Sequence, residues 1–340
     1  MRDVDYFNEA LSLFAVLPSF QTDHLVLAGR SIHLNTPSPA LRETFLPPIA
    51  HLVTGEKTVE PDLTIWYAES KDLFKKLTGP PGEPFNDRGY RAGDGDDVQI
   101  FFYPYQTQVF LYSRSKRTGM YWVSAAEDIP WWDTTCSFRV IFHLWTRDLP
   151  AQLVHAGAIA NKDTGVLITG VSGSGKSTSC LNLLRAGYKY LGDDFVWIEL
   201  EPVPVVHALY QTAKVEVANF VERFIEWQPF VKNPDYPNQK VLIHVKDMLP
   251  GQWLKASKLK AILLPAVSGR EQTTLARVSS SNAFFGMAPS TLHFLPHNRD
   301  LSYQKLLRVS SALPTYNWQL GFDKQQFQSS FTTFIENELS

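Results

Sequence analysis

The stretch Gly165-Val166-Leu167-Ile168-Thr169-Gly170-Val171-Ser172-Gly173-Ser174-Gly175-Lys176-Ser177 decides the fold of the second half of this chain. Its first five residues form a short apolar run, which predicts a buried strand. Apolar residues at helical spacing follow from Lys176 to Ala186, and Gly187 is placed as a helix stop. Tyr188 to Leu191 returns to a strand pattern. A strand, a loop, a helix and a strand within about 30 residues predict a βαβ unit and an α/β fold.

The glycine-rich segment between this strand and helix has the composition of a phosphate-binding loop. Glycines let the backbone turn so that consecutive N–H groups face one point, and the start of the next helix adds a positive field. In such loops a lysine contacts the β- and γ-phosphates and the next hydroxyl binds magnesium. We therefore predict a site for ATP and Mg²⁺ formed by Gly170, Ser172, Gly173, Ser174, Gly175, Lys176, Ser177 and Thr178. The alternative is a Gly/Ser-rich turn that matches by chance.

Two adjacent carboxylates, Asp193 and Asp194, follow the second strand. If that strand runs parallel to the first, its carboxyl end opens on the same edge as the loop, and both carboxylates reach the γ-phosphate region. One would then lie near the metal, and the other would accept a proton from an attacking hydroxyl. The alternative is a solvated acidic turn, which Gly192 would also suit. The position beside the loop favours the catalytic interpretation.

The segment from His155 to Asp194 resembles the catalytic segment of the HPr serine kinase family, whose phosphate loop is related to that of phosphoenolpyruvate carboxykinases. The matching elements are His155-Ala156-Gly157-Ala158, the strand and loop to Ser177, Arg185-Ala186-Gly187 and Leu191-Gly192-Asp193-Asp194. The resemblance implies Asp194 as proton acceptor, Ser177 as magnesium ligand, Lys176 as the phosphate-contacting lysine and His155 as the active-site histidine. From its sequence surroundings alone, His155 would be interpreted as a structural histidine. Asp193 is then the carboxylate near the metal.

Two features differ from the family. Val171 occupies a loop position that is often acidic in HPr kinases, and no Glu-Leu-Arg-Gly-type segment with a second metal ligand follows Asp194. The first half of the chain and Pro130-Trp131-Trp132 are similar in layout to divergent HPr kinase-like proteins. Some of those phosphorylate a serine of a ribosomal peptide precursor, including lasso-peptide precursors. The acceptor is therefore left open.

The first half of the chain has a β-like pattern. Aromatic and β-branched runs at Leu63 to Tyr67, Val98 to Tyr103 and Val109 to Tyr112 predict strands. Between Trp131 and Leu149, apolar residues at helical spacing predict a helix. We therefore expect a mainly β domain that recognises the substrate over 1–130, a linking helix over 131–150 and an HPr kinase-like nucleotide-binding catalytic domain over 151–340.

Composition and charge exclude several classes of partner. The net charge is −2, and no run of Lys and Arg with interleaved aromatics would follow a nucleic-acid backbone. No apolar stretch approaches the roughly 20 residues that span a bilayer, and residues 1–20 lack the pattern of a secretory signal. Cys136 and Cys180 form neither a disulfide framework nor a metal-ligand spacing. We expect a cytoplasmic protein without nucleic-acid or membrane partners, and a homo-oligomer is compatible with the sequence.

Together these features predict an ATP- and Mg²⁺-dependent kinase that transfers the γ-phosphoryl group to a serine hydroxyl of a protein or peptide, with Asp194 as general base. Two alternatives are a kinase for a small molecule such as free serine, and a nucleotide-binding regulator with slow turnover. Intact Lys176, Ser177 and Asp194 argue against the regulator. Such enzymes usually also use a cation to stabilise the transferring group. The sequence offers Lys214, Lys246 and Arg270 for that role without choosing among them.

Overall fold

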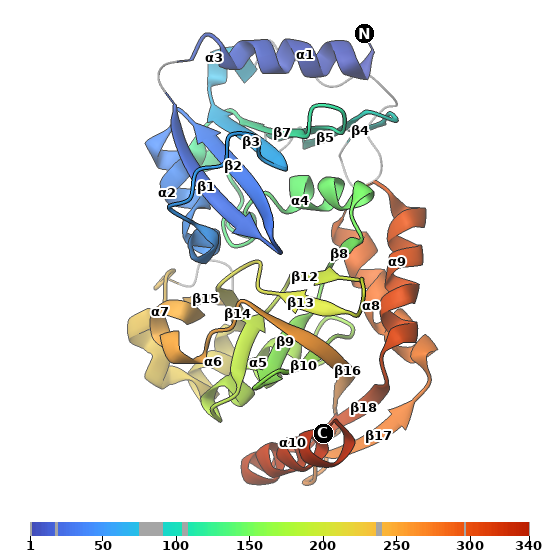
Figure 1. The fold of residues 1–340 in the computed structure, drawn as a ribbon. Helices are drawn as coiled ribbons and strands as arrows, with labels where there is room; N and C mark the ends of the chain where they lie inside the picture. Colours follow the sequence, from blue (N-terminus) through green and yellow to red (C-terminus); the bar gives the residue numbers. More distant parts are fainter. Residues whose placement is uncertain are drawn as a thin grey trace. The chain divides into compact units, whose positions relative to one another are not determined.

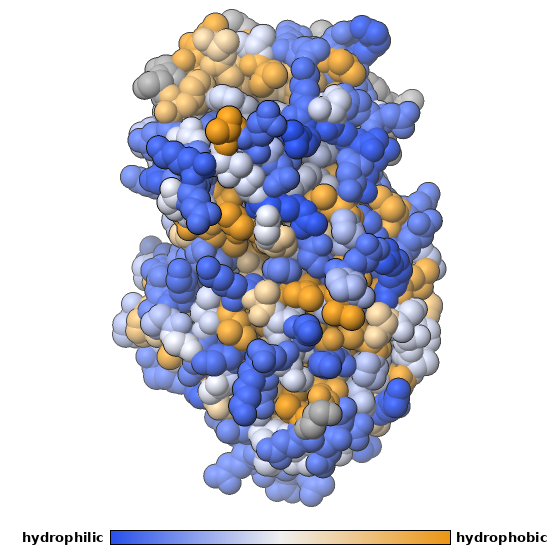
Figure 2. Space-filling view, in the orientation of Figure 1, coloured by the Kyte–Doolittle hydropathy of each residue, from blue (hydrophilic) through white to orange (hydrophobic). Residues whose placement is uncertain are grey.

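The protein folds into two compact units, and a computed structural model describes residues 2–17, 20–74, 91–103, 108–235, 240–295 and 297–339. The first unit comprises residues 1–149 and 295–298, and the second comprises residues 150–294 and 299–340. Figure 1 shows their helices and strands. Hydrophilic side chains dominate the face of the molecule in Figure 2, with smaller groups of hydrophobic residues among them. Within the described ranges, no helix is both long and apolar enough to cross a membrane.

The first unit is built on a mixed sheet with the strand order β1-β2-β3-β7-β6-β5-β4. β3 pairs in parallel with β2 and β7, and the other neighbours are antiparallel. The strands are β1 (Gln21–Leu27), β2 (Arg30–Thr36), β3 (Leu63–Glu69), β4 (Arg91–Asp94), β5 (Val98–Tyr103), β6 (Gln108–Ser113) and β7 (Thr118–Val123). The helices are α1 (Asp3–Phe14), α2 (Pro39–Phe45), α3 (Lys71–Phe74) and α4 (Arg139–Trp145), with 3₁₀ turns at Pro47–Leu52, Ala126–Asp128 and Thr146–Asp148.

The strands predicted in this half are confirmed as β3, β5 and β6. One face of the sheet is covered by α1, whose buried residues fall on one side of the helix, as an amphipathic helix requires. They pack with residues of β5, β6 and β7, and are Tyr6, Phe7, Ala10 and Phe14. The sequence analysis named no particular helix in this segment, so α1 adds to the strands that the sequence pattern predicted.

The helix expected over 131–150 is present only over Arg139–Trp145, and all its residues are buried. Residues 131–137 form turns and bends, and Phe138 adopts a left-handed backbone with φ of 55° just before the helix begins. α4 belongs to the first unit, whose longer segment ends at residue 149. The apolar spacing thus located a helix correctly, but such spacing reports burial and not a place between domains.

The second unit is built, within the described residues, on a nine-stranded sheet. Its main path is β11-β9-β10-β16-β13-β12-β8, and β18 joins β16 to β17. The strands are β8 (Ala151–Val154), β9 (Gly157–Asn161), β10 (Thr164–Ile168), β11 (Lys189–Gly192), β12 (Val196–Glu199), β13 (Val205–His207), β16 (Ala256–Val267), β17 (Thr274–Val278) and β18 (Thr315–Leu320). β14 (Thr212–Glu216) and β15 (Lys240–His244) form a separate antiparallel pair.

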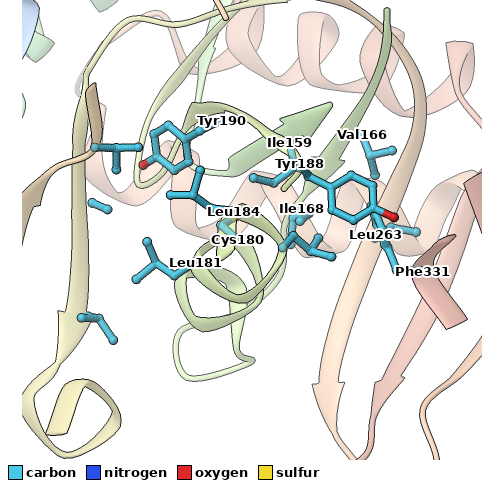
Figure 3. Close-up of a cluster of buried hydrophobic side chains, with 14 of the residues drawn as sticks. Ile159, Val166, Ile168, Cys180, Leu181, Leu184, Tyr188, Tyr190, Leu263 and Phe331 are labelled. Atoms are coloured by element: carbon cyan, nitrogen blue, oxygen red, sulfur yellow. The ribbon is translucent and has the colours of Figure 1, made fainter. Parts of the chain in front are cut away.

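Six helices of the described residues accompany this sheet: α5 (Lys176–Arg185), α6 (Val217–Arg223), α7 (Val245–Met248), α8 (Ser280–Phe294), α9 (Arg299–Ala312) and α10 (Lys324–Glu338). Successive residues of a strand point to opposite faces, so each face of the sheet has its own core. Val166 and Ile168 of β10 pack with α5, β14 and β15, as Figure 3 shows in part. Leu167 packs on the opposite face with α8 and α9. Burial on both faces fixes the end of β10, where the glycine-rich loop begins.

The predicted βαβ arrangement is present with one strand inserted. β10 and β11 each pair antiparallel with β9, which lies between them. They therefore run in the same direction without being neighbours, because β9 and β10 form a hairpin before α5 begins. The carboxyl ends of β10 and β11 open on the same edge of the sheet, as the sequence analysis expected.

Candidate active site

The loop between β10 and α5 turns through backbone conformations that favour glycine. Gly170, Gly173 and Gly175 have φ values of 151°, 78° and 101°, where a Cβ would cause strain. Gly175 is the N-cap of α5, and no side chain caps the helix. Val171 and Ser172 at the tip are exposed. The loop therefore presents backbone to solvent at the positive end of a ten-residue helix, an arrangement that suits an anion.

Lys176 begins α5 and is buried, with 9% of its surface exposed. Its Nζ donates to the carbonyl oxygens of Gly170 at 2.9 Å and Val171 at 3.0 Å. Burial lowers the pKa of this ammonium, and the negative charges of Asp193 and Asp194 oppose that effect. The lysine therefore folds back over the loop and lies in the field of both carboxylates.

Asp193 lies at the end of β11 and is 1% exposed. Its Oδ1 accepts a hydrogen bond from Ser177 Oγ at 3.1 Å, and its Oδ2 accepts one from the backbone N–H of Lys214 at 3.4 Å. Burial raises the pKa of Asp193, and the neighbouring charge of Asp194 adds to the increase. This buried carboxylate therefore gains from any cation placed beside it.

The carboxylate of Asp194 accepts hydrogen bonds from two side chains, Lys214 and His155. Its Oδ2 lies 2.5 Å from Lys214 Nζ, and its Oδ1 lies 3.1 Å from His155 Nε2. Burial opposes ionisation, but the Lys214 ammonium and the His155 ring outweigh it and hold the pKa of Asp194 well below its usual range. The two adjacent aspartates thus have pKa values shifted in opposite directions, which is typical of acid–base sites.

The backbone at Asp194 is unusual. Its φ is 76°, which is rare for a residue other than glycine, and Phe195 N–H donates to the carbonyl oxygen of Asp193 at 3.1 Å. A hydrogen bond between residues i+2 and i around a positive φ defines a strained γ-turn. Such strain collects at functional sites, where surrounding contacts maintain it. Here the turn and the two contacts of the carboxylate together fix its direction.

His155 follows β8 and is held on several sides. Its ring contacts those of Phe195 and Phe294, at centroid distances of 5.2 Å and 5.1 Å. Its backbone N–H donates to Thr291 Oγ1 at 3.1 Å. With Nε2 donating to Asp194, the ring acts as a positioning group for that carboxylate.

The structure brings His155, Lys176, Ser177, Asp193 and Asp194 together at one edge of the sheet. The other predicted loop residues are arranged around them. Ser172 is exposed, Ser174 Oγ is buried without a partner among the described atoms, and Thr178 lines a cavity farther along α5.

Lys214, on β14, is the candidate cation that contacts Asp194. Lys246 lies on α7, and Arg270 lies in the turn after β16. Nothing in the local sequence distinguishes the three, because only the fold brings β14 beside the end of β11.

Sequence reasoning missed the contribution of α8. Thr291 and Phe294 contact His155. A Cβ on Gly286 would lie 3.7 Å from Gly170 Cα and only 2.8 Å from Leu264 Cδ2, so α8 also packs closely against the start of the loop. The one local signal was a glycine inside a helical pattern, which often marks close packing.

The donor set at this edge fits magnesium. Mg²⁺ commonly binds one or two protein oxygens together with substrate phosphates and water. Ser177 Oγ and the buried Asp193 carboxylate, 3.1 Å apart, supply such oxygens. Among the described residues, no group of three or more His, Cys, Asp or Glu could hold a metal ion by itself, so a bound metal would need ligands from the nucleotide.

The chain is similar in sequence to several curated HPr kinase/phosphorylases. HPr kinase/phosphorylase from Lactobacillus acidophilus is 37% identical over 97 residues, which are 26% of this chain and 30% of the relative. The same protein from Shouchella clausii is 32% identical over 99 residues (27% and 32%), and that from Bacillus subtilis is 38% identical over 68 residues (20% and 22%). No family model matches the chain.

A solved structure of Hpr(Ser) kinase/phosphatase from Coxiella burnetii covers 54% of this chain and 89% of that chain, at 12% identity and a TM-score of 0.31. The chain spans less than a third of the length of the curated relatives named above. All three curated relatives named above are HPr kinase/phosphorylases. Over 20–27% of its length, the chain is therefore similar in sequence to HPr kinase/phosphorylases.

Proposed function

We propose that the chain is a kinase that uses Mg²⁺ and ATP to phosphorylate a serine hydroxyl of a protein or peptide. The observation that carries the proposal is the arrangement at the end of β11, where Ser177 contacts Asp193 while Lys214 and His155 contact Asp194. Phosphoryl transfer needs a phosphate cradle, a metal site, a group that orients the nucleophile and a cation near the transferring group. Each has a candidate at this edge of the sheet.

The triphosphate would lie on the glycine loop with its γ-phosphate toward Asp193. Lys176 would exchange the carbonyl oxygens of Gly170 and Val171 for phosphate oxygens, because bonds between an ammonium and an anion are stronger. Ser177 and Asp193 would hold Mg²⁺, which neutralises phosphate charge when bound. The raised pKa of Asp193 supports this role, because burial of its carboxylate is costly until a cation compensates it.

Asp194 would accept the proton of the attacking hydroxyl. Its low pKa keeps it ionised at neutral pH, so it can accept, although a strongly paired carboxylate is a weak base. We infer that Lys214 turns toward the negative charge on the transferring group. Its effect on Asp194 then weakens, and the carboxylate becomes more basic. The hydroxyl oxygen bonds to the γ-phosphorus, the bond to the ADP oxygen breaks, and the proton passes to Asp194.

The proposed acceptor is macromolecular. The curated relatives are named as kinases of HPr, and the family resemblance implies transfer to serine. Because this chain spans less than a third of those relatives, HPr itself is not carried over as the acceptor. The first unit, which is compact by itself, is the proposed place of acceptor recognition.

The test is a transfer assay with the full chain, Mg²⁺ and ATP. Seryl peptides, including precursor peptides encoded near the gene, and free serine would be offered separately, and products would be identified by mass spectrometry. We expect a phosphorylated serine in at least one peptide, and no product from the same peptide with that serine replaced by alanine. Phosphorylation of free serine alone would support the small-molecule kinase. ATP turnover without any phosphorylated acceptor would contradict the proposal.

A further inference from the structure

A cavity of the second unit lies beside the glycine loop. Its volume is about 400 Å³, within the range of small-molecule sites. It is bounded by the loop and the exposed side of α5, by the ends of β16 and β18, and by the first turns of α10. Nothing in the sequence patterns indicated it, because its walls come from segments about 150 residues apart in the chain.

The cavity lies on one particular side of the loop. Gly173, Gly175 and Thr178 line it, whereas Asp193 and Asp194 do not. Leu320 links the loop to the wall, since a Cβ on Gly175 would lie 2.9 Å from Leu320 Cδ1. A ligand that extends from the loop into this cavity therefore leads away from the carboxylates. In phosphate-binding loops of this type, the lysine reaches the β- and γ-phosphates and the next hydroxyl binds Mg²⁺, so these groups belong on the side of Asp193 and Asp194.

The walls suit a flat and partly polar group. Phe322 is 67% exposed, and the Phe327 ring is held in place by stacking on Trp318 at a centroid distance of 5.1 Å. Both line the cavity, together with the amide side chains of Asn182 and Gln325. Aromatic rings stack on nucleobases of any sequence, and side-chain amides both donate to and accept from base edges.

Three cations line the cavity, Arg185, Arg223 and Lys324, and the two arginines are engaged within the protein. Arg185 donates to the Arg223 carbonyl oxygen at 2.6 Å and to Asn182 Oδ1 at 2.8 Å, and it pairs with Glu226 at 3.2 Å. Arg223 pairs with Glu222 at 3.0 Å. Both guanidinium groups are thus paired with carboxylates, and the exposed Lys324 is the remaining cation of the lining.

We propose that this cavity binds the nucleoside of the nucleotide whose phosphates lie on the loop, with Phe322 stacking on the base. The inference rests on the proposed function and deepens it, because it fixes the direction of the nucleotide. The base and ribose lie along α5, and the γ-phosphate faces Asp193 and Asp194. If the nucleotide bound to the loop in the opposite direction, the leaving ADP would occupy the place beside Asp193 and Asp194 where the acceptor hydroxyl must enter.

The test compares two ligands that share phosphates and differ in the nucleoside. Binding of Mg²⁺·ATP and of inorganic tripolyphosphate with Mg²⁺ would be measured by calorimetry on the full chain and on three variants. These are Phe322→Ala, Lys176→Ala, and Phe285→Ala as a matched control. Phe285 is 68% exposed on α8, contacts the Phe284 ring and is absent from the cavity lining.

We expect Phe322→Ala to weaken ATP binding about tenfold, the usual scale for one stacked base, and to leave tripolyphosphate binding unchanged. Unchanged tripolyphosphate binding also shows that the variant is folded. Lys176→Ala should weaken both ligands, and Phe285→Ala neither. If Phe322→Ala binds ATP as the natural chain does while Lys176→Ala loses both ligands, the nucleoside inference is wrong and the kinase proposal stands. If the natural chain binds neither ligand, both fail.

Discussion

The two sides of the glycine loop differ in how they are built. On the carboxylate side, formed by His155, Asp193, Asp194 and Lys214, the side chains of Lys214 and His155 contact Asp194, and Asp193 is buried. On the cavity side, rings and amides surround an open space of about 400 Å³. The comparison indicates that the side proposed for chemistry is preorganised by charge, and the side proposed for the nucleoside is organised by shape.

The largest effect is expected at Lys214. Lys214→Met should lower the transfer rate by about two to three orders of magnitude, the usual loss when a group that stabilises transition-state charge is removed. It should also raise the pKa of Asp194, because the ammonium is the main group that lowers it. The acid limb of the rate against pH should therefore move to higher pH.

Lys246→Met is the matched control, because Lys246 was an equal candidate in the sequence but lies on α7. Equal losses of transfer rate in Lys214→Met and Lys246→Met would contradict the proposed role of Lys214 at the transferring group. A rate loss in Lys214→Met without any shift of the acid limb would separate Lys214 from Asp194. Lys214→Arg should recover part of the rate, since it keeps the charge.

A smaller effect is expected at His155. His155→Gln should lower kcat about tenfold, the scale of one hydrogen bond to a charged group, because Asp194 loses one of the contacts that fix its direction. The Kd of ATP should change little, since His155 lies on the carboxylate side of the loop. Steady-state kinetics and calorimetry would measure both quantities, with His207→Gln on β13 as the control. A weaker ATP complex with unchanged kcat would contradict the positioning role.

The smallest effect is on stability. Asp193→Asn should raise Tm in metal-free buffer at neutral pH by about 2–4 °C, if the buried charge costs about 1 kcal/mol. Because folding raises the pKa of Asp193, the natural chain loses stability as pH rises from the usual carboxyl range through that raised pKa. The advantage of the asparagine variant should therefore vanish at acid pH and grow toward neutrality.

Thermal unfolding of the natural chain and of Asp193→Asn, measured over a range of pH, would give the difference in Tm between them. Asp193→Asn should at the same time lose the Mg²⁺-dependent rise in Tm that ATP gives the natural chain. A variant that is less stable than the natural chain at every pH would mean that Asp193 contributes favourably as an anion even without metal.

Much of the carboxylate side could be predicted from sequence, because its parts are local. The strand, loop and helix from Gly165 to Arg185 and the aspartates after β11 follow one another in the chain at short spacing. The direction of β11 followed from the βαβ pattern. The insertion of β9 between β10 and β11 did not, because sequence spacing does not specify which strands become neighbours.

The rest depends on distant segments. Lys214 is 20 positions beyond Asp194 on a separate strand pair, and its role appears only through the 2.5 Å contact. Thr291 and Phe294 reach His155 from α8, and Phe322 reaches the loop side from beyond β18. None of these segments has a local motif, because their residues act through tertiary packing.

The central claim is that the loop binds the nucleotide while Asp194 serves the chemistry, and one comparison tests it most directly. Phosphoryl transfer from Mg²⁺·ATP to a seryl acceptor peptide would be measured for the natural chain and for Asp194→Asn, with ATP affinity measured on the same samples. We predict a loss of at least about two orders of magnitude in rate, the scale of a general base, with ATP affinity changed only a few-fold. Equal transfer rates in the two proteins would contradict the account.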